Sequence, residues 1–271
     1  MKAWSLACNT AEVPVPGSAA RVIQVRRTGK GCLSYVIGSG DEAHVIDASV
    51  DSEVYLQLAA ENGWKIAGVL ETHVHADHLS RARKLAEVSE AILYLPEQNR
   101  VSYPFSPVRD GDALEVGGAR LEALGTPGHT PESTSYLLDG GALFTGDTLF
   151  TAAVGRPDLD TDAEGARKRA RALYGSLQRI LSLPGEALIL PGHASEPVTF
   201  DRQPIATTLA EVRERTEVLG LSEEEFVRRI TMRVPPAPAN YERIVVLNEA
   251  GRLPEGDPTD LEAGANRCAL G

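Results

Sequence analysis

The chain has 271 residues, of which 42% are hydrophobic and 24% charged, and its 27 basic and 38 acidic side chains give a net charge of −11. This length fits one large α/β domain or one domain with an extension, and the apolar fraction is too high for a disordered chain. The acidic balance argues against a nucleic-acid partner, because phosphate backbones bind clustered Lys and Arg. The sequence contains no uncharged apolar stretch near the length of about 20 residues that a membrane span needs.

The N-terminus and the cysteines favour a cytoplasmic location. The apolar run at residues 3–7 is shorter than the core of about 7–15 residues in a secretory signal, so we expect residues 1–19 to form an N-terminal arm. The cysteines, Cys8, Cys32 and Cys268, are odd in number and have no metal-binding spacing, which suits a reducing compartment. We expect Cys32 to be a small buried strand residue.

Hydrophobic runs between turn residues predict the secondary structure in chain order. Strands are expected at residues 21–26, 31–37 and 43–47, the last two joined as a hairpin. These are followed by a helix at 51–62, a strand at 66–70, a helix at 79–90 and a strand at 91–95. This alternation favours an α/β layer. A second sheet is expected from short β runs at 114–124, 134–138, 142–145 and 187–190, with a helix at 162–183.

The character of the chain changes near residue 201. Residues 205–219 are expected to be helical, and Ser222 with Glu225 forms the capping-box pattern of another helix. A stretch rich in proline and glycine then runs to residue 258. We therefore expect residues 201–271 to be a C-terminal extension that packs on the core.

Four metal-capable side chains lie in the segment His73-Val74-His75-Ala76-Asp77-His78, directly after the predicted strand at 66–70. In an extended loop, residues i and i+2 project to the same side, so His73 and His75 can face one point. Asp77 is expected to cap the next helix, with His78 in its first turn. The segment therefore predicts a convergence of ligands where a strand meets a helix.

Three further candidate ligands also follow predicted strands: His129 in Thr126-Pro127-Gly128-His129, Asp147 after the strand at 142–145, and His193 in Pro191-Gly192-His193. Catalytic sites in α/β proteins favour such strand ends. Five of the six histidines thus belong to these motifs, which surface histidines placed by chance would not do. We predict a metal site, and expect His44 to be a structural residue of its strand.

These motifs resemble those of the metallo-β-lactamase superfamily. His-x-His-x-Asp-His at 73–78, Thr-Pro-Gly-His at 126–129, Thr-Gly-Asp at 145–147 and Pro-Gly-His at 191–193 occur in the family's order. The resemblance covers about residues 20–200. It implies an α/β fold, the αββα sandwich, with the metal at one edge of two facing sheets. We therefore expect a metallo-β-lactamase-like metal-binding domain at residues 20–200 and a helical or irregular extension after it.

Within the superfamily, Val-Gly-Arg-Pro-Asp-Leu at 154–159 is similar to the persulfide dioxygenase branch. Gly-His-Thr-Pro-Glu-Ser at 128–133 is similar to the bacterial forms fused to rhodanese domains. The resemblance implies one Fe²⁺ on His73, His129 and Asp147, a set that leaves positions open for substrate sulfur and O₂. The remaining four metal-capable residues would orient ligands and water around it: His75, Asp77, His78 and His193.

A dinuclear zinc hydrolase of the same fold is the alternative, because all seven ligands are present. As in glyoxalase II, one Zn²⁺ would lie on His73, His75 and His129, and the other on Asp77, His78 and His193, with Asp147 bridging. A water between the ions would then attack a thioester. Zinc is redox-inert and could not perform oxygen chemistry. A non-catalytic binding module is disfavoured by the intact ligand set.

The Gly-Arg-x-Asp element at 155–158 favours the dioxygenase, which would oxidise glutathione persulfide or a similar low-molecular-weight persulfide with O₂ to sulfite and thiol. Asp77, His78 and Arg156 are the expected catalytic residues. Arg156 and Asp158 are expected to bind the anionic substrate through the guanidinium fork. The alternative is that these two residues pair with each other and hold their loop. The expected partners are the thiol or persulfide and O₂, without nucleic acid or membrane, and a homodimer is left open.

Overall fold

The computed structural model describes residues 8–27, 29–194, 202–232, 234–258, 260–264 and 267–270. What the sequence predicts for residues 1–7 and 195–201 lies outside the described residues. Among the described helices, none combines the length and the apolar character needed to cross a membrane.

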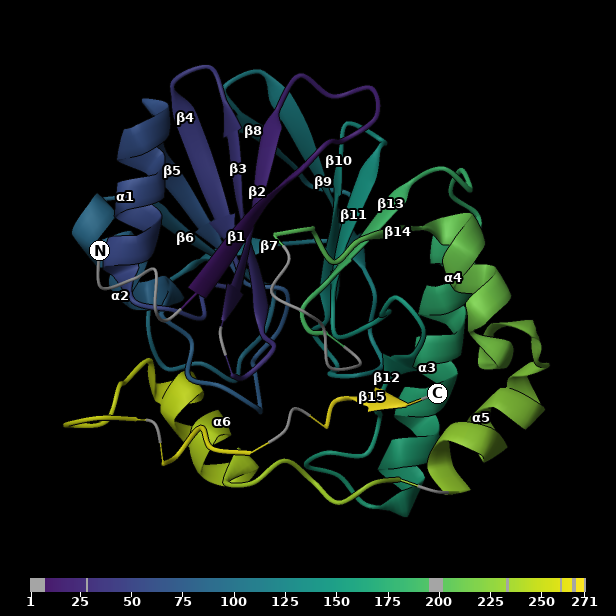
Figure 1. Ribbon diagram of the computed structural model, residues 1–271. Coiled ribbons are helices and arrows are strands. Elements are labelled where there is room, and N and C mark those ends of the chain that lie inside the picture. Colours follow the sequence, from purple (N-terminus) through teal and green to yellow (C-terminus); the bar gives the residue numbers. More distant parts are fainter. Residues whose placement is uncertain are drawn as a thin grey trace.

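Two β-sheets face each other and helices cover their outer faces, so the predicted αββα sandwich is confirmed (Figure 1). The first sheet has the strand order β1-β2-β3-β4-β5-β6-β7. Its strands are β1 (Cys8–Val13), β2 (Arg21–Arg27), β3 (Leu33–Ser39), β4 (Glu42–Ile46), β5 (Lys65–Leu70), β6 (Ile92–Pro96) and β7 (Ser106–Val108). Helices α1 (Ser52–Asn62) and α2 (Ala82–Ser89) pack against its outer face.

The second sheet has the strand order β14-β13-β11-β10-β9-β8. Its strands are β8 (Ala113–Val116), β9 (Ala119–Gly125), β10 (Thr134–Leu138), β11 (Ala142–Gly146), β13 (Leu188–Pro191) and β14 (Thr207–Thr208). Its outer face is covered by α3 (Ala163–Leu181), α4 (Leu209–Arg215), the short 3₁₀ helix η2 (Glu217–Gly220) and α5 (Glu223–Met232).

Strand β3 shows why the sequence reads as continuous hydrophobic runs. Val36 packs into the apolar layer under α1 and α2, whereas its neighbours Tyr35 and Ile37 enter the layer between the two sheets. Successive side chains of a strand point to opposite faces, so a strand covered on both sides is apolar throughout. Tyr35 meets Phe144 of the second sheet edge-on, with ring centroids 4.9 Å apart.

The described part of the expected N-terminal arm belongs to the first sheet. Strand β1 pairs antiparallel with β2 from Cys8 opposite Arg27 to Val13 opposite Val22. Ala11 and Val13 are buried while Glu12 between them is exposed, as in a half-buried strand. The edge of the sheet is therefore formed by residues that the sequence places outside it.

Three predicted boundaries are wrong. Helix α2 begins at Ala82, and Arg81 occupies its N-cap position, so Asp77 does not cap it and His78 is not in its first turn. Positive φ angles at Gly117 and Gly118 divide the expected run at 114–124 into β8 and β9. The helix expected at 205–219 is replaced by β14, α4 and η2, since Thr208 caps α4 with a full capping box.

After η2, the described part of the C-terminal extension contains one predicted and one unexpected helix. The capping box of α5 is confirmed, because Ser222 N donates to Glu225 Oε2 at 3.2 Å and Glu225 N donates to Ser222 Oγ at 3.4 Å. Helix α6 (Tyr241–Ala250) lies within the stretch that reads as a loop because prolines and glycines flank it. Further on, β15 (Ala269–Leu270) pairs antiparallel with β12 (Val154–Gly155), which joins the extension to the loop after Asp147.

Candidate metal centre

The seven predicted ligands come together at one edge of the two sheets. Four of them follow β5, and one each follows β9, β11 and β13, as the sequence predicts. Each is at most 2% exposed: His73, His75, Asp77, His78, His129, Asp147 and His193. They do not form one uniform cluster. They fall into three groups of side chains that have different partners.

The first group is His73, His129 and Asp147. Nε2 of His73 and Nε2 of His129 lie 3.9 and 3.6 Å from Asp147 Oδ2. The other nitrogen of each ring is held by the protein: His73 Nδ1 lies 2.9 Å from Thr72 Oγ1, and His129 Nδ1 donates to the Arg156 carbonyl at 2.8 Å. A carbonyl only accepts, so His129 carries its proton on Nδ1 and offers the lone pair of Nε2.

This first group fits a metal ion. His73 Nε2 and Asp147 Oδ2 are buried and have no hydrogen-bond partner among the described residues. Buried polar atoms in proteins nearly always have a partner. Burial lowers the pKa of both His73 and His129, which keeps their rings neutral, the form in which imidazole binds a metal. Two ring nitrogens and one carboxylate oxygen are therefore available in a dry setting.

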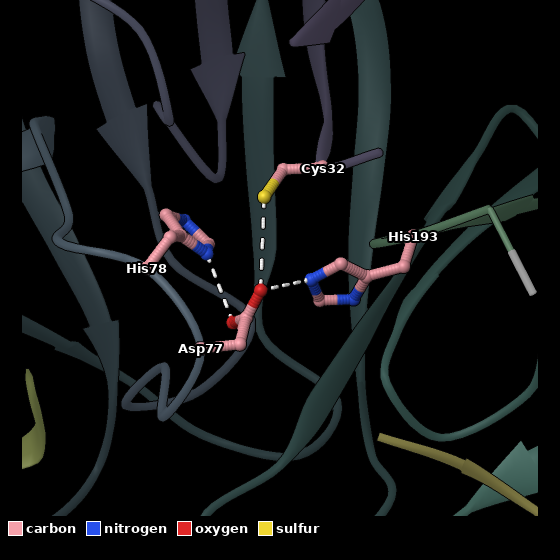
Figure 2. Close-up of side chains that lie close together, drawn as sticks. All are labelled: Cys32, Asp77, His78 and His193. Carbon is pink, nitrogen blue, oxygen red and sulfur yellow. Dashed lines mark hydrogen bonds and ion pairs between the residues drawn. The ribbon is translucent and has the colours of Figure 1, made fainter. Parts of the chain in front are cut away.

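The second group is Cys32, Asp77, His78 and His193, whose side chains converge on the Asp77 carboxylate (Figure 2). Asp77 Oδ2 lies 2.6 Å from His193 Nε2 and accepts from Cys32 Sγ at 3.6 Å, while Oδ1 lies 3.0 Å from His78 Nδ1. His78 Nε2 is buried and has no partner among the described residues. Both carboxylate oxygens of Asp77 are thus already engaged.

His193 joins the two groups. Its Nδ1 lies 2.6 Å from Asp147 Oδ1, and its Nε2 lies at the same distance from Asp77. Burial by itself would lower the pKa of His193, but these two carboxylates outweigh it and raise that pKa well above its usual range. His193 is therefore a cation between two anions, and it leaves Oδ2 as the open oxygen of Asp147.

Cys32 is a member of this group that its sequence spacing does not reveal. It pairs with His193 in an isolated β-bridge, and Leu33 N donates to the Gly192 carbonyl at 2.8 Å, so the start of β3 lies beside the end of β13. Burial would raise the pKa of the Cys32 thiol, but His78 and His193 together outweigh it and the pKa falls to about 7. Cys32 is buried as expected, but it also contacts Asp77.

The third group is Asp47, Glu71 and His75. His75 Nε2 lies 2.8 Å from Glu71 Oε2 and 3.3 Å from Asp47 Oδ1. Burial favours neutral His75, but the two carboxylates outweigh it and raise its pKa well above the usual range. His75 Nδ1 is buried and has no hydrogen-bond partner within the described ranges, so it is the ring nitrogen left for a metal. Glu71 directly precedes the Thr72-His73 pair, which is the one signal that could have identified this group in the sequence.

Two glycines allow the loops to approach Asp147. A Cβ atom on Gly155 would lie 2.0 Å from the Asp147 carbonyl oxygen, and one on Gly192 would lie 2.8 Å from Asp147 Oδ1. Any side chain at Gly155 would force the backbone apart. This close approach explains the glycine of the Gly-Arg-x-Asp element.

Arg156 does not lie as a substrate-binding residue would. It is 1% exposed, and all five of its N–H groups are engaged within the protein. Nε and Nη2 each donate to one carboxylate oxygen of Asp158 at 2.8 Å. The other three bonds go to carbonyl oxygens of the extension, at Pro235, Pro236 and Arg267. The expectation that Arg156 and Asp158 bind substrate is corrected: Arg156 holds its loop to the extension and orients His129 through its own carbonyl.

The extension also holds the loop that carries four of the ligands. Asn248 on α6 donates through Nδ2 to the carbonyls of His75 and His78, at 2.8 and 2.9 Å. Glu262 accepts from Leu79 N at 2.7 Å and forms ion pairs with Arg81 and Arg27. These residues are distant in sequence from every motif, so sequence reasoning missed them.

A buried set of imidazoles and carboxylates at the edge of an αββα sandwich defines a metal-dependent enzyme. Residues 27–193 match the family described as the metallo-beta-lactamase superfamily, and the chain belongs to this superfamily. The family resemblance of the sequence motifs is thereby confirmed.

Individual relatives divide between two activities. The chain is 30% identical over 225 residues to the mitochondrial persulfide dioxygenase of Bos taurus, which covers 81% of this chain and 84% of that protein. It is 33% identical over 153 residues to the hydroxyacylglutathione hydrolase of Methylobacillus flagellatus, which covers 56% of this chain and 57% of the hydrolase. The crystal structure of ETHE1 from Myxococcus xanthus superposes with a TM-score of 0.73 at 32% identity, over 84% of this chain and 97% of that one.

Proposed function

We propose that this protein is a persulfide dioxygenase that uses one ferrous ion on His73, His129 and Asp147. In the reaction, a persulfide RSSH, O₂ and water give the thiol RSH and sulfite with two protons. The sulfane sulfur is oxidised, O₂ is reduced, and the carrier thiol leaves with a proton. Glutathione persulfide is the expected substrate.

The observation that carries this proposal is that the carboxylates of Asp147 and Asp77 differ in how many of their oxygens are already hydrogen-bonded. Asp147 Oδ2 has no hydrogen-bond partner in the described part of the chain and lies 3.6–3.9 Å from two imidazole nitrogens, whereas both oxygens of Asp77 are engaged. One carboxylate with two histidines is the ligand set of non-haem iron oxygenases, which keeps positions open for substrate and O₂. The greater extent of one match adds support, since the match to the bovine dioxygenase spans 81% of this chain and the match to the hydrolase 56%.

When bound, the iron would supply the redox chemistry and the positions at which sulfur and O₂ meet. Residues of the chain would orient the ligands of this iron. Protonated His193 fixes Oδ1 of Asp147, so Oδ2 faces the two histidines. Asp77 in turn holds the charge on His193. Arg156 fixes the tautomer of His129 through its carbonyl. Such outer contacts orient ligands and tune the metal.

The test is elemental analysis of protein purified anaerobically, followed by oxygen uptake and sulfite release after glutathione persulfide is added. The expected result is close to one iron per chain and persulfide-dependent oxygen uptake. Protein reconstituted with zinc is the control and should consume no oxygen. Two zinc ions per chain together with rapid hydrolysis of a glutathione thioester would overturn the proposal.

A dinuclear thioester hydrolase is the second candidate, because His75 Nδ1 and His78 Nε2 are also buried and unpartnered among the described residues. His75 would complete the position of the first ion with His73 and His129, and His78 would complete a second position with Asp77 and His193. The same metal analysis separates the two candidates.

A further inference from the structure

A small pocket adjoins the metal centre and is lined by six separate parts of the chain. Val74 and Ala76 come from the ligand loop, His129 from the first group, and Arg169 from α3. Tyr241 comes from α6 of the extension. Since His129 is one of the expected iron ligands, a molecule in this pocket lies next to the metal.

Three charged residues line the pocket: Asp160 and two arginines, Arg100 and Arg169, which differ in how far their charge is already paired. Arg100 is already neutralised, because its Nη1 and Nε pair with Glu132 and Glu249, each at 2.9 Å. Arg169 is half-buried and forms no ion pair with the described part of the chain. Its one hydrogen bond there runs from Nη1 to the carbonyl of Leu159.

The guanidinium of Arg169 therefore has donors to offer. Nε and Nη2 form no hydrogen bond with the described residues, in contrast to Arg156, whose five N–H groups are all engaged. Burial, and then the nearby Arg100, lower the pKa of Arg169 and outweigh the opposite effect of Asp160, Glu132 and Asp158, so these carboxylates compensate its charge only in part. An anion in the pocket would compensate it.

On the basis of the proposed function, we infer that Arg169 binds a carboxylate of the persulfide substrate. The substrate class is then a low-molecular-weight persulfide whose carrier thiol bears a carboxylate, with its sulfur directed toward His129. A planar guanidinium can donate two parallel hydrogen bonds to a carboxylate. A local cation is needed because a protein of net charge −11 otherwise repels such an anion.

The test compares two persulfides in Arg169→Gln. Glutathione persulfide carries carboxylates and 2-hydroxyethyl persulfide carries none. The KM for glutathione persulfide should rise about tenfold or more with little change in kcat, as expected for loss of a charged hydrogen bond. The KM for 2-hydroxyethyl persulfide should not change. Arg171→Gln is the matched control on the same helix, because Arg171 is 60% exposed and faces Glu223 of α5.

A binding measurement without turnover separates this inference from the proposed function. S-methylglutathione has the carboxylates but no reactive sulfur, and calorimetry should show about tenfold weaker binding to Arg169→Gln than to the wild type or Arg171→Gln. If the wild type oxidises neither persulfide while this difference persists, the dioxygenase proposal fails and the carboxylate site stands. If both persulfides are oxidised and Arg169→Gln behaves like Arg171→Gln, the site is wrong and the dioxygenase stands. Equal losses with both persulfides would also overturn the site.

Discussion

The first and second groups of the metal centre contain similar residues but differ in which atoms are already engaged. In the first group, Nε2 of His73 and Nε2 of His129 approach Asp147. The Nδ1 atom of each ring forms a hydrogen bond with another group of the protein. In the second group, both oxygens of the Asp77 carboxylate are already engaged in contacts with His78, His193 and Cys32. Residue type alone therefore does not define a metal site. The partners of each donor atom decide whether it has a lone pair left.

The two groups also differ in what supports them. The first is tied to the sheets and to Arg156, whereas the loop of the second is fastened from outside by Asn248 and Glu262. Substitutions in the two groups should therefore have different effects on metal content, activity and stability.

The largest effect is expected for His129→Ala. Iron content and oxygen uptake should fall together, by more than the roughly 100-fold that residues orienting a ligand contribute, because a ligand itself is removed. His44→Ala is the matched control, since His44 is also buried but belongs to none of the three groups, and it should keep its iron. Full iron content in His129→Ala would remove this residue from the ligand set. Elemental analysis and an oxygen electrode measure both quantities.

Asp77→Asn should have the next largest effect. Iron should stay bound, but activity should fall about 10–100-fold, because His193 loses one of the two charges that keep it protonated. The iron-to-protein ratio and the oxygen uptake rate are measured on the same sample. A fall from two metal ions per chain to one would show that the second group binds an ion, and the contrast between the groups would vanish.

Glu262→Gln tests the support of the second group. Burial would raise the pKa of Glu262, but Arg27 and Arg81 outweigh it and lower that pKa from 4.5 to about 2. A depressed pKa stabilises the fold above the unfolded value near 4.5, and this contribution is lost as the pH falls toward 2. At pH 7 the variant should be less stable by roughly 3 kcal/mol, and the difference should shrink below pH 4.5.

Denaturant unfolding over a pH series measures this difference. Glu12→Gln is the control, because Glu12 forms an exposed pair with Arg21 that contributes at most about 1 kcal/mol. A difference between the wild type and Glu262→Gln that stays constant from pH 7 to pH 3 would be inconsistent with an ionised Glu262 as its source.

The smallest effect is expected for Cys32→Ser. The serine hydroxyl can still donate to Asp77, so iron content should be unchanged and activity should stay within about threefold of the wild type. Cys268→Ser should be equally mild, because Cys268 packs beside Phe150 and Ala153 and a serine hydroxyl would keep a hydrogen-bond donor near Asp147. Loss of a metal ion in Cys32→Ser would make the thiolate a ligand, and the second group would have to be counted as a metal site.

That the seven candidate ligands lie at one edge of the sheets could be predicted because they lie in short motifs and follow strands that are apolar throughout. Asp77 as a helix cap was wrong, since its contacts with His78 and His193 replaced the local capping preference. Arg156 was assigned to the substrate because the sequence shows a guanidinium but not the acceptors around it.

The remaining contributors meet the site only through tertiary contacts. Cys32 reaches it by a bridge to His193, and Asn248 reaches it from a helix hidden between prolines and glycines. Arg169 is one of several basic residues along α3, and its sequence context does not distinguish it from Arg171. Only packing decides which of the two lines the pocket.

The contacts of Asn248 and Glu262 with the ligand loop also determine when, during synthesis of the chain, the metal centre can assemble. These residues are synthesised 173 and 183 positions after the loop residues that they bind, His75 and Leu79. At about 5–20 residues per second, the nascent chain carries the histidine loop for roughly 10–40 seconds before Asn248 and Glu262 are synthesised. During that interval the histidines are present but their backbone is not yet held. The loop reaches its final shape only after Glu262 has been synthesised, so assembly of the metal centre is one of the last events in the maturation of this protein.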